Sequence, residues 1–295
     1  MKKFIKHMML IFFGLIVILL FLDFSFTTVY ENSEPRTKFQ YLRSLKNKKV
    51  DYIFLGSSRV ENSIVSKLIR DKTGKSAINL GFQASKMSDI YTVLKLIKKY
   101  NIKTDKILIQ VDYIFNIEDG CSNILQYELM PFIRENEVTQ EYFNRCLINK
   151  KEILYTPFYR YLHYEPKIGF REFFLNLINK KTSIVKNNGF VPLQGNSFEH
   201  NNSLPSQIIS KNKYFDGIKT FAEINKMPVI FFCVPFCKHT KNLIFIKKLK
   251  QKIPELYDFS GVINNDKMFK NCSHLNQNGA NDFTKYLIEK MLIDK

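Results

Sequence analysis

The sequence predicts an α/β protein with a three-layer α/β/α sandwich around a mainly parallel five-stranded sheet. Short apolar runs alternate along the chain with segments of helical periodicity, and these segments are long enough to be crossover connections between parallel strands. The composition agrees, because 45% of the 295 residues are hydrophobic and only 11 are glycine. These values exclude disordered, collagen-like and small disulfide-scaffold classes, so the chain has to bury a large core.

The N-terminal segment is predicted to be a membrane anchor. Lys2, Lys3 and Lys6 precede an uncharged apolar run at residues 8–22, and the sequence stays mostly apolar through Phe26. This length predicts a transmembrane helix at 8–26 behind a cytoplasmic tail at 1–7. Because Lys prefers the cytoplasmic side, we expect the N-terminus inside and the main domain outside the cytoplasmic membrane.

A cleaved export signal has the same charged-then-apolar order and is the strongest alternative. No small-x-small cleavage site follows Leu22 and no lipobox cysteine is present, which favours an uncleaved single-pass signal-anchor. Either version would leave the domain in the same compartment.

Residues 27–50 predict a linker followed by an amphipathic helix, because Pro35 opens a mixed apolar and basic pattern (PRTKFQYLRSLKNKK). The α/β domain is expected at 51–295. Its first part has the pattern β-α-β-α-β, which predicts a parallel sheet. The predicted strands are 51–55, 77–80 and 106–111, with helices at 61–70 and 86–100.

A mainly helical insertion is predicted at about residues 119–205, where Phe, Tyr, Asn and Lys are frequent and no strand run is clear. Its aromatic residues are expected mainly as packing residues, with a sugar-stacking platform as the alternative. The α/β pattern then resumes. The predicted helices are 207–225, 241–252 and 278–293, and the predicted strands are 228–234 and 255–259.

The formal net charge of +18 does not predict a nucleic-acid partner, because the basic residues are spread almost evenly as Lys-rich doublets. Most are expected to be solvated surface residues. Attraction to an anionic partner, such as a phospholipid surface or an acidic glycan, is the alternative.

The five cysteines are an odd number and show no zinc-ligand spacing. Cys233 and Cys237 flank a Pro-containing strand end, and a disulfide between them or a pair of reduced buried thiols are both left open. No P-loop, GxGxxG, HExxH or EF-hand motif occurs, so neither a cofactor nor a metal site is predicted.

Chemistry in a parallel α/β sheet is expected at the carboxyl ends of the strands. Gly56, Ser57 and Ser58 follow the first strand and precede a helix. A serine there presents its hydroxyl beside the backbone N–H groups of a helix N-terminus, as an activated nucleophile and an oxyanion site both require. A helix N-cap is the simpler alternative for such a serine. Near the other end of the chain, the segment NCSHLNQNG places His274 in a polar loop before the last helix.

Together these motifs resemble the SGNH/GDSL superfamily of esterases and acyltransferases, in its membrane-anchored branch with GSS in place of GDS. The resemblance rests on FLGSSR after the first strand, NLG after the second, and HLN followed by a glycine and a terminal helix. It covers about residues 50–117 and 206–292, and it implies a flavodoxin-like SGNH fold for the α/β domain.

The resemblance implies Ser58 as the nucleophile, with Ser57 as the fallback, and His274 as the general base. The backbone N–H groups of Ser58 and Gly81 would form the oxyanion hole. Each of these residues also has a non-catalytic explanation. Gly81 could be only a turn residue that ends a strand, and a loop histidine such as His274 is often simply exposed to solvent.

Arg59 is a candidate substrate-binding residue, because a guanidinium grips a carboxylate or phosphate bidentately. A salt bridge to a neighbouring carboxylate, such as Glu61 or Asp89, is its alternative.

Two departures from the family pattern bear on the site. The family's Gly-x-Asn-Asp block is absent after the third strand, where Asn116 is the stand-in for the oxyanion-binding asparagine. The aspartate three residues before the histidine is replaced by Asn271. In a serine-protease triad, replacing the aspartate by an amide costs about 10⁴ in turnover through the wrong tautomer. Three explanations of this replacement are open. The first-ranked is that Asn271 orients His274 through its side-chain carbonyl. The alternatives are that Asp266 or another loop carboxylate does so, or that the site is catalytically dead.

The sequence therefore predicts a membrane-anchored SGNH-like serine esterase or O-acyltransferase that acts on acyl groups of a cell-envelope carbohydrate or another small acyl ester. One alternative is a catalytically degenerate envelope protein that binds glycan or serves as a partner in polysaccharide assembly. Another is a structural membrane protein in which Ser58 only caps a helix. That last alternative predicts that Ser58 and His274 lie far apart.

Overall fold

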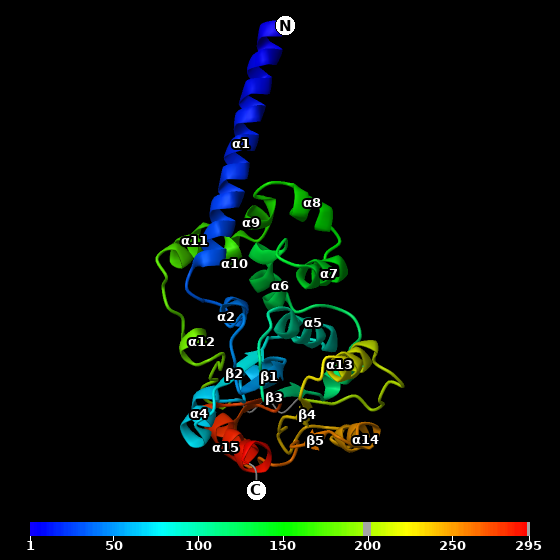
Figure 1. The fold of residues 1–295 in the computed structure, drawn as a ribbon. Helices are drawn as coiled ribbons and strands as arrows, with labels where there is room; N and C mark the ends of the chain where they lie inside the picture. The colour runs from blue at the N-terminus through cyan, green and yellow to red at the C-terminus, as the bar shows by residue number, and fades with distance from the viewer. Residues whose placement is uncertain (197–201, 294–295) are drawn as a thin grey trace.

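The computed structural model describes residues 1–196 and 202–293 (Figure 1). Its centre is a five-stranded parallel sheet with strand order β2-β1-β3-β4-β5, which confirms the predicted fold class. The strands are β1 (Tyr52–Gly56), β2 (Ala77–Gly81), β3 (Lys106–Gln110), β4 (Val229–Cys233) and β5 (Tyr257–Asp258).

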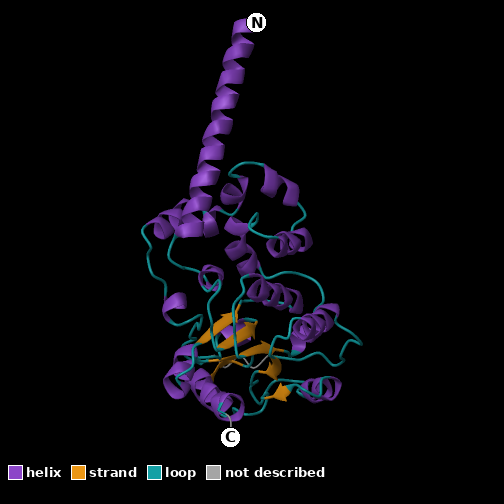
Figure 2. Ribbon diagram, in the orientation of Figure 1, coloured by secondary structure: helices purple, strands orange, loops and turns teal. Residues whose placement is uncertain are grey.

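Helices cover both faces of the sheet (Figure 2). In β1, Ile53 and Leu55 point into one apolar cluster, and Tyr52 and Phe54 point into the other, as the two-residue period of a strand requires. The first cluster includes α5 (Met87–Lys99), α13 (Lys213–Ile224) and α14 (Ile244–Lys252). The second includes α4 (Ser66–Thr73) and α15 (Gln277–Leu287), which continues as a π-helical turn over Ile288–Leu292.

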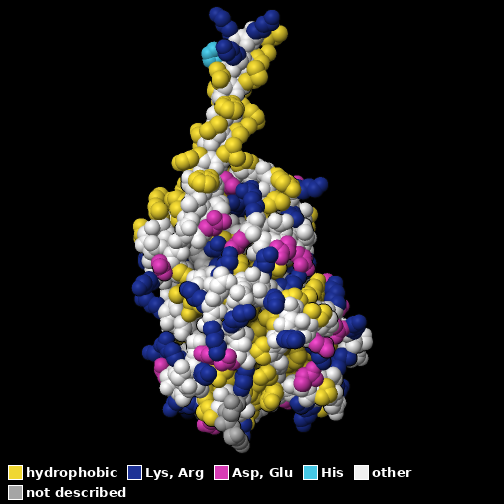
Figure 3. Space-filling model, viewed as in Figure 1, with side chains coloured by type: hydrophobic (Ala, Val, Ile, Leu, Met, Phe, Trp, Pro, Cys, Tyr) yellow, Lys and Arg dark blue, Asp and Glu magenta, His cyan; other side chains and the backbone are white. Residues whose placement is uncertain are grey.

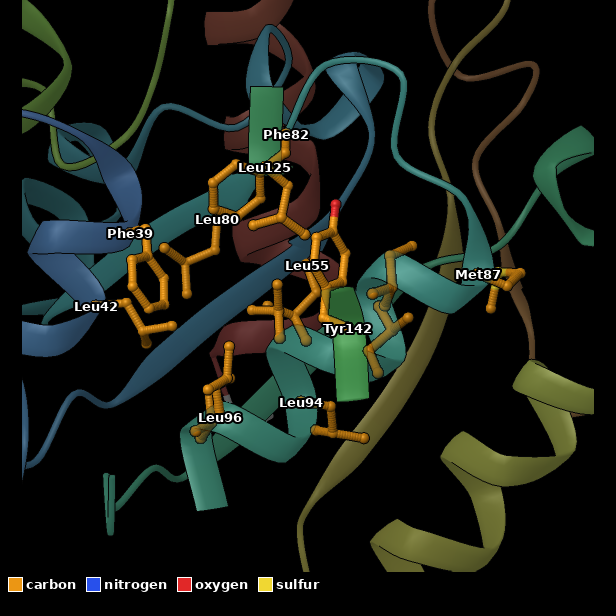
Figure 4. Packing of buried hydrophobic residues seen from close by; sticks show 14 of the residues in the cluster. Phe39, Leu42, Leu55, Leu80, Phe82, Met87, Leu94, Leu96, Leu125 and Tyr142 are labelled. Carbon is orange, nitrogen blue, oxygen red and sulfur yellow. The ribbon is translucent and has the colours of Figure 1, made fainter. Parts of the chain in front are cut away.

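The larger cluster joins the sheet to the helices packed beside it (Figure 4). Leu55 and Leu80 come from the strands, and Phe39 and Leu42 come from α2 (Lys38–Ser44). Leu94 and Leu96 of α5, Leu125 of α6 (Asn123–Leu129) and Tyr142 of α7 (Glu137–Cys146) complete this part of the core. The sheet and the inserted helices therefore share one hydrophobic core.

The helix α1 (Lys2–Asn32) projects from the folded part of the chain (Figure 1). It is apolar and long enough to span a membrane, with a mean hydropathy of 2.7 over an 18-residue window, although a signal sequence passes the same test. Its last third is different, because Asp23, Phe26 and Tyr30 are buried against the rest of the protein.

Between β3 and α13, the described residues form short helices joined by loops, and Ser203 forms an isolated bridge with Lys241. A short 3₁₀ turn, Tyr113–Asn116, follows β3, and another, Met130–Phe132, follows α6. The helices are α6 (Asn123–Leu129), α7 (Glu137–Cys146), α8 (Lys150–Tyr155), α9 (Tyr159–His163), α10 (Glu165–Ile168), α11 (Phe170–Leu177) and α12 (Ser183–Lys186).

Several predicted elements differ from the structure. Residues 27–32, predicted as part of a linker, continue α1, which ends at Asn32. The last helix, predicted to run to 293, becomes a π turn after Leu287. The helix expected at 61–70 is two helices, α3 (Ser58–Glu61) and α4, because the Asn79 side chain from β2 binds the carbonyls of Val60 and Ile64 between them. The helix expected at 207–225 begins only at Lys213, where the Asn212 side chain caps it. The segment before the last helix also contains a two-stranded antiparallel hairpin, β6 (Phe269–Asn271) and β7 (His274–Leu275), where the sequence predicts a loop.

Candidate active site

Ser58 is the first residue of α3, at the carboxyl end of β1. The turn before it is tight, since a Cβ on Gly56 would lie 2.3 Å from the Val60 side chain and 2.5 Å from Oε1 of Gln110. Only glycine leaves room for the helix to start this close to the strand.

The two serines of the turn have different tasks. Ser57 is buried, caps α3 by accepting from the N–H of Arg59, and donates its hydroxyl to Oε1 of Gln110 at 3.0 Å. Ser58 is partly exposed and its hydroxyl is directed to His274. The N-cap explanation therefore applies to Ser57, and Ser58 is the serine that a substrate can reach.

His274 lies on the β6–β7 hairpin, opposite the N-terminus of α3. Its Nε2 is 2.8 Å from Oγ of Ser58, although 216 residues separate the two in the sequence. This distance excludes the structural alternative in which Ser58 and His274 lie far apart.

Asn271 fixes the orientation of this imidazole. Its Oδ1 accepts from the backbone N–H groups of Ser273 and His274, each at 3.0 Å, and lies 3.0 Å from Nδ1 of His274. Two backbone donors identify that atom as the carbonyl oxygen rather than the amide nitrogen. Nδ1 must then carry the proton, and Nε2 presents its lone pair to the Ser58 hydroxyl.

Burial lowers the pKa of His274 to about 4, with a further contribution from the nearby Arg59 cation. The imidazole is therefore neutral over the physiological range and able to accept a proton. It is also a weak base, because none of the described carboxylates forms a hydrogen bond that would stabilise the imidazolium formed by proton transfer.

Arg59 is not available to a substrate, contrary to the sequence prediction. It is fully buried, and its Nε donates to Oδ2 of Asp112 at 2.8 Å, whereas the predicted alternatives were Glu61 and Asp89. Its other nitrogens donate to the backbone carbonyls of Val234, Pro235 and Ser273. Arg59 thus joins α3 to the loop after β4 and to the hairpin that carries His274.

Gly81 is also not an open oxyanion donor. Its N–H donates to Oδ1 of Asn79 at 3.0 Å, and a Cβ at this position would lie 2.4 Å from the backbone nitrogen of Glu61. The physical reason for the glycine is the close approach of α3 to the end of β2. The turn that follows contains Ala84 with φ of 58°, and the Phe82 N–H donates to the Gly56 carbonyl beside the site.

Asn116 and Asp266 are engaged elsewhere. Asn116 donates to the carbonyl of Gln207 at 2.7 Å and accepts from the N–H of Ile209 at 3.3 Å, so its amide holds the 207–209 loop. Oδ2 of Asp266 pairs with Lys238 and His239. Within residues 1–196 and 202–293, no carboxylate forms a hydrogen bond to His274.

A disulfide supports the hairpin. Cys272, between Asn271 and His274, is bonded to Cys237 in the loop after β4, and a second disulfide joins Cys121 to Cys146. Cys233 is a free buried thiol, so the pairing of Cys233 with Cys237 that the sequence left open is wrong.

Sequence reasoning missed the buried support of the site. Gln110 accepts from both the N–H and the hydroxyl of Ser57, and its amide donates to Asp112 at 2.6 Å. The signal was present, because QVD at the end of the third strand places polar residues where an apolar strand reaches the chemically active edge of the sheet.

The arrangement brings a reachable hydroxyl, a neutral imidazole of defined tautomer and an orienting amide into one chain of hydrogen bonds. These are the parts required for nucleophilic attack with general-base assistance.

Comparison with known protein families gives no match, and no curated protein matches the chain. Among solved structures, the chain is similar to one from Streptococcus pneumonia, provisionally described as a platelet activating factor, at 12% identity and a TM-score of 0.30. The similarity covers 96% of this chain and 98% of that chain. A TM-score this low carries no argument, so function has to be argued from the site itself.

Proposed function

We propose that the protein is a membrane-anchored serine esterase or O-acyltransferase of the SGNH type. The observation that carries the proposal is the chain Ser58–His274–Asn271, with 2.8 Å between Oγ and Nε2 and 3.0 Å between Nδ1 and Oδ1. It stands at the carboxyl end of a parallel sheet, where the GSS and HLN motifs of the SGNH resemblance converge.

In the proposed reaction, Oγ of Ser58 attacks the carbonyl carbon of an ester while its proton passes to Nε2 of His274. The tetrahedral intermediate collapses, the leaving alkoxide takes the proton from Nε2, and the acyl group stays on Ser58. Water or a sugar hydroxyl then gives its proton to Nε2 and attacks the acyl-enzyme. The second tetrahedral intermediate releases Oγ of Ser58, which takes the proton back from Nε2, so that the serine hydroxyl and the neutral imidazole are both restored.

The oxyanion would be bound by backbone amides. Among the residues that the structure describes, none accepts a hydrogen bond from the N–H of Ser58, which stands at the N-terminus of α3. The N–H groups of Gln83 and Ala84, in the turn after Gly81, have no acceptor there either. We assign the oxyanion to Ser58 and this turn, in place of Gly81 and Asn116.

We assign α1 as an uncleaved anchor with the N-terminus in the cytoplasm. Lys2, Lys3 and Lys6 precede the apolar run, which favours that orientation. Phe26 is 1% exposed, so cleavage after the apolar run would remove or expose part of the core. The two disulfides favour an oxidising, extracytoplasmic location for the domain.

The proposed substrate is an acylated cell-envelope carbohydrate. This follows from the SGNH resemblance and the proposed location, since a domain tethered outside the cytoplasmic membrane meets envelope polymers. The choice between water and a sugar hydroxyl as acceptor is the difference between hydrolase and transferase.

A degenerate site that only binds glycan is the second candidate, and Asn271 is the observation that favours it. No described carboxylate orients His274, as that candidate requires. Against it, the imidazole does have an orienting partner, and Nε2 presents its lone pair to the Ser58 hydroxyl, as a general base requires.

The test is labelling of the full-length protein by a serine-directed fluorophosphonate. We expect stoichiometric labelling that is lost in Ser58→Ala and reduced at least about a hundredfold in His274→Ala, because removal of a general base costs 10²–10⁴. Ser57→Ala is the matched control, since it removes a neighbouring hydroxyl that caps α3, and it should retain labelling. Absence of labelling in the folded wild type would favour the binding protein.

A further inference from the structure

Exposed apolar side chains lie on the helices near the place where α1 enters the folded part of the chain (Figure 1). We call this set the collar: Tyr155 at the end of α8, Leu162 on α9, Phe170, Phe174 and Leu177 on α11, and Ile178 after α11. Their exposed fractions run from 45% to 74%. Figure 3 shows hydrophobic side chains gathered at this end of the domain, directly below the apolar stem of α1.

The helix α11 carries three of the collar residues beside a ring that packs on α1. Phe173 stacks on Phe26 of α1, with 4.1 Å between ring centroids, and so occupies the inner side of α11. Phe170, Phe174 and Leu177 are spaced i, i+4 and i+7 and form a stripe next to Phe173. Phe170 also meets the Phe26 ring, with 5.2 Å between centroids, whereas Phe174 and Leu177 are each more than half exposed. A stripe of this kind that stays exposed marks an interface.

The position of the collar along α1 coincides with the start of its apolar stem. Asp23 is buried and paired with Arg134 and Arg160, and it is the last charged residue before the uncharged run at 8–22. Phe21, two residues further out, is 67% exposed. If α1 spans the bilayer, the bilayer surface must lie close to Asp23, at the level of the helices that carry the collar (Figure 1).

The charge of the same segment is positive. Residues 148–181 contain seven Lys and Arg residues and three Glu residues. Lys151, Arg171, Lys180 and Lys181 among them are exposed. Aromatic and aliphatic side chains combined with Lys and Arg suit the interfacial region of an anionic bilayer.

We propose that the collar is a membrane-docking surface that inserts into the headgroup region of the anionic bilayer crossed by α1. The inference rests on the anchor part of the proposed function and is independent of the catalytic part. Together, α1 and the collar hold the domain upright, with the catalytic sheet at its end remote from the membrane (Figure 1).

The chain contains no tryptophan, so a single introduced tryptophan reports on one position. The full-length protein would be reconstituted in phosphatidylglycerol vesicles whose acyl chains are brominated, since bromine quenches tryptophan on contact. Phe174→Trp tests the collar and Phe13→Trp tests the apolar stem of α1. Tyr257→Trp is the matched control, an aromatic exchange at a position 47% exposed on β5, within the sheet remote from α1.

We expect Phe174→Trp and Phe13→Trp to lose most of their fluorescence and to emit at shorter wavelength, while Tyr257→Trp is unchanged. Quenching of Phe13→Trp alone would overturn the collar and leave the anchor standing. If the fluorescence of Phe13→Trp is not quenched, both the membrane anchor and the collar are contradicted. Equal quenching of all three variants would show that the protein adsorbs to the vesicles without a specific docking surface, which also contradicts the collar. Fluorophosphonate labelling of the same three proteins reports on the catalytic proposal separately.

Discussion

At the scale of single residues, Asn271 decides what His274 is able to do. An amide beside an imidazole usually leaves two arrangements open, because its oxygen and nitrogen can exchange places. Here two backbone N–H groups hold the oxygen toward Nδ1, so the tautomer needed for catalysis is enforced. What the amide cannot supply is negative charge for the imidazolium.

The pH dependence of labelling should follow from this environment. Labelling needs neutral His274, whose pKa is about 4, so the rate should rise as pH increases through about 4 and stay flat above it. In Asn271→Asp, a carboxylate favours the imidazolium and should raise this pKa by about 1–3 units. The rising limb then moves toward neutral pH, and the plateau rate increases because the base is stronger.

The gain in Asn271→Asp should stay well below the factor of about 10⁴ known for the reverse exchange in a serine-protease triad, since that loss came from the wrong tautomer. The measurement is the labelling rate from pH 3 to 9 in wild type and variant. Asp266→Asn is the control, because that carboxylate pairs with Lys238 and His239 instead. If the labelling rate of Asn271→Asp rises over the same pH range as that of the wild type, residue 271 does not act on His274.

Sequence reasoning placed Ser58, His274 and Asn271 as candidates because each lies at a strand end or at a fixed spacing from another motif residue. It misassigned Arg59 and Gly81 for one physical reason. Whether a guanidinium or an amide N–H is free depends on tertiary neighbours, here Asp112 and the Asn79 side chain, which no local pattern reveals.

At the scale of elements, Arg59 connects three segments that meet at the site. Removing one partner of a buried ion pair leaves the other charge unpaired, at a cost of about 3–5 kcal/mol. We therefore expect Arg59→Gln to lower the free energy of unfolding by that amount and to slow labelling, because the hairpin loses its bond at Ser273.

The measurement for Arg59→Gln is a double-mutant cycle by chemical denaturation. Adding Asp112→Asn should destabilise by clearly less than the sum of the two single effects, since the unpaired charge is then gone. Strict additivity would contradict the ion pair.

The two disulfides offer a matched comparison between elements. They close loops of similar length, with sequence separations of 35 and 25, so the loss of either should cost about 3–4 kcal/mol. Only Cys237–Cys272 holds the hairpin of His274. Replacing this pair by serines should slow labelling on the order of tenfold or more, because catalysis is sensitive to small misplacements.

Replacing Cys121 and Cys146 by serines should leave the labelling rate of the folded fraction unchanged. Thermal melts and labelling rates of both variants at a temperature below their transitions decide the question. Equal slowing in both would mean that general stability, rather than the position of the hairpin, controls the rate.

The strands and crossover helices of the sheet followed from apolar runs and their spacing, because buried parallel strands carry an almost continuous signal. The β6–β7 hairpin did not. Its strands have three and two residues, and they are held by the disulfide and by Asn271, so no period could show them.

At the scale of the whole molecule, α1 is both a stem and a part of the core. The ring of Phe26 contacts Phe158, Tyr161, Phe170 and Phe173, and the hydroxyl of Tyr30 donates to the carbonyl of Ile168 at 3.0 Å. A hydropathy pattern predicts the stem alone, because it cannot tell a lipid-facing phenylalanine from one buried in protein. The consequence is that the domain is attached rigidly to α1 rather than through a flexible linker.

This integration predicts different costs for two phenylalanines of the same helix. Phe26 is 1% exposed, so Phe26→Ala leaves a cavity and should lower the stability of the domain by about 3–5 kcal/mol. Phe12 is 64% exposed on the stem, so Phe12→Ala should leave the thermal transition of the domain unchanged. Both variants are compared as full-length protein in the same detergent, with the loss of near-ultraviolet circular dichroism as the readout. Equal thermal transition temperatures for the two variants would mean that the C-terminal end of α1 does not belong to the core. A cleaved signal sequence would then be favoured over an uncleaved anchor.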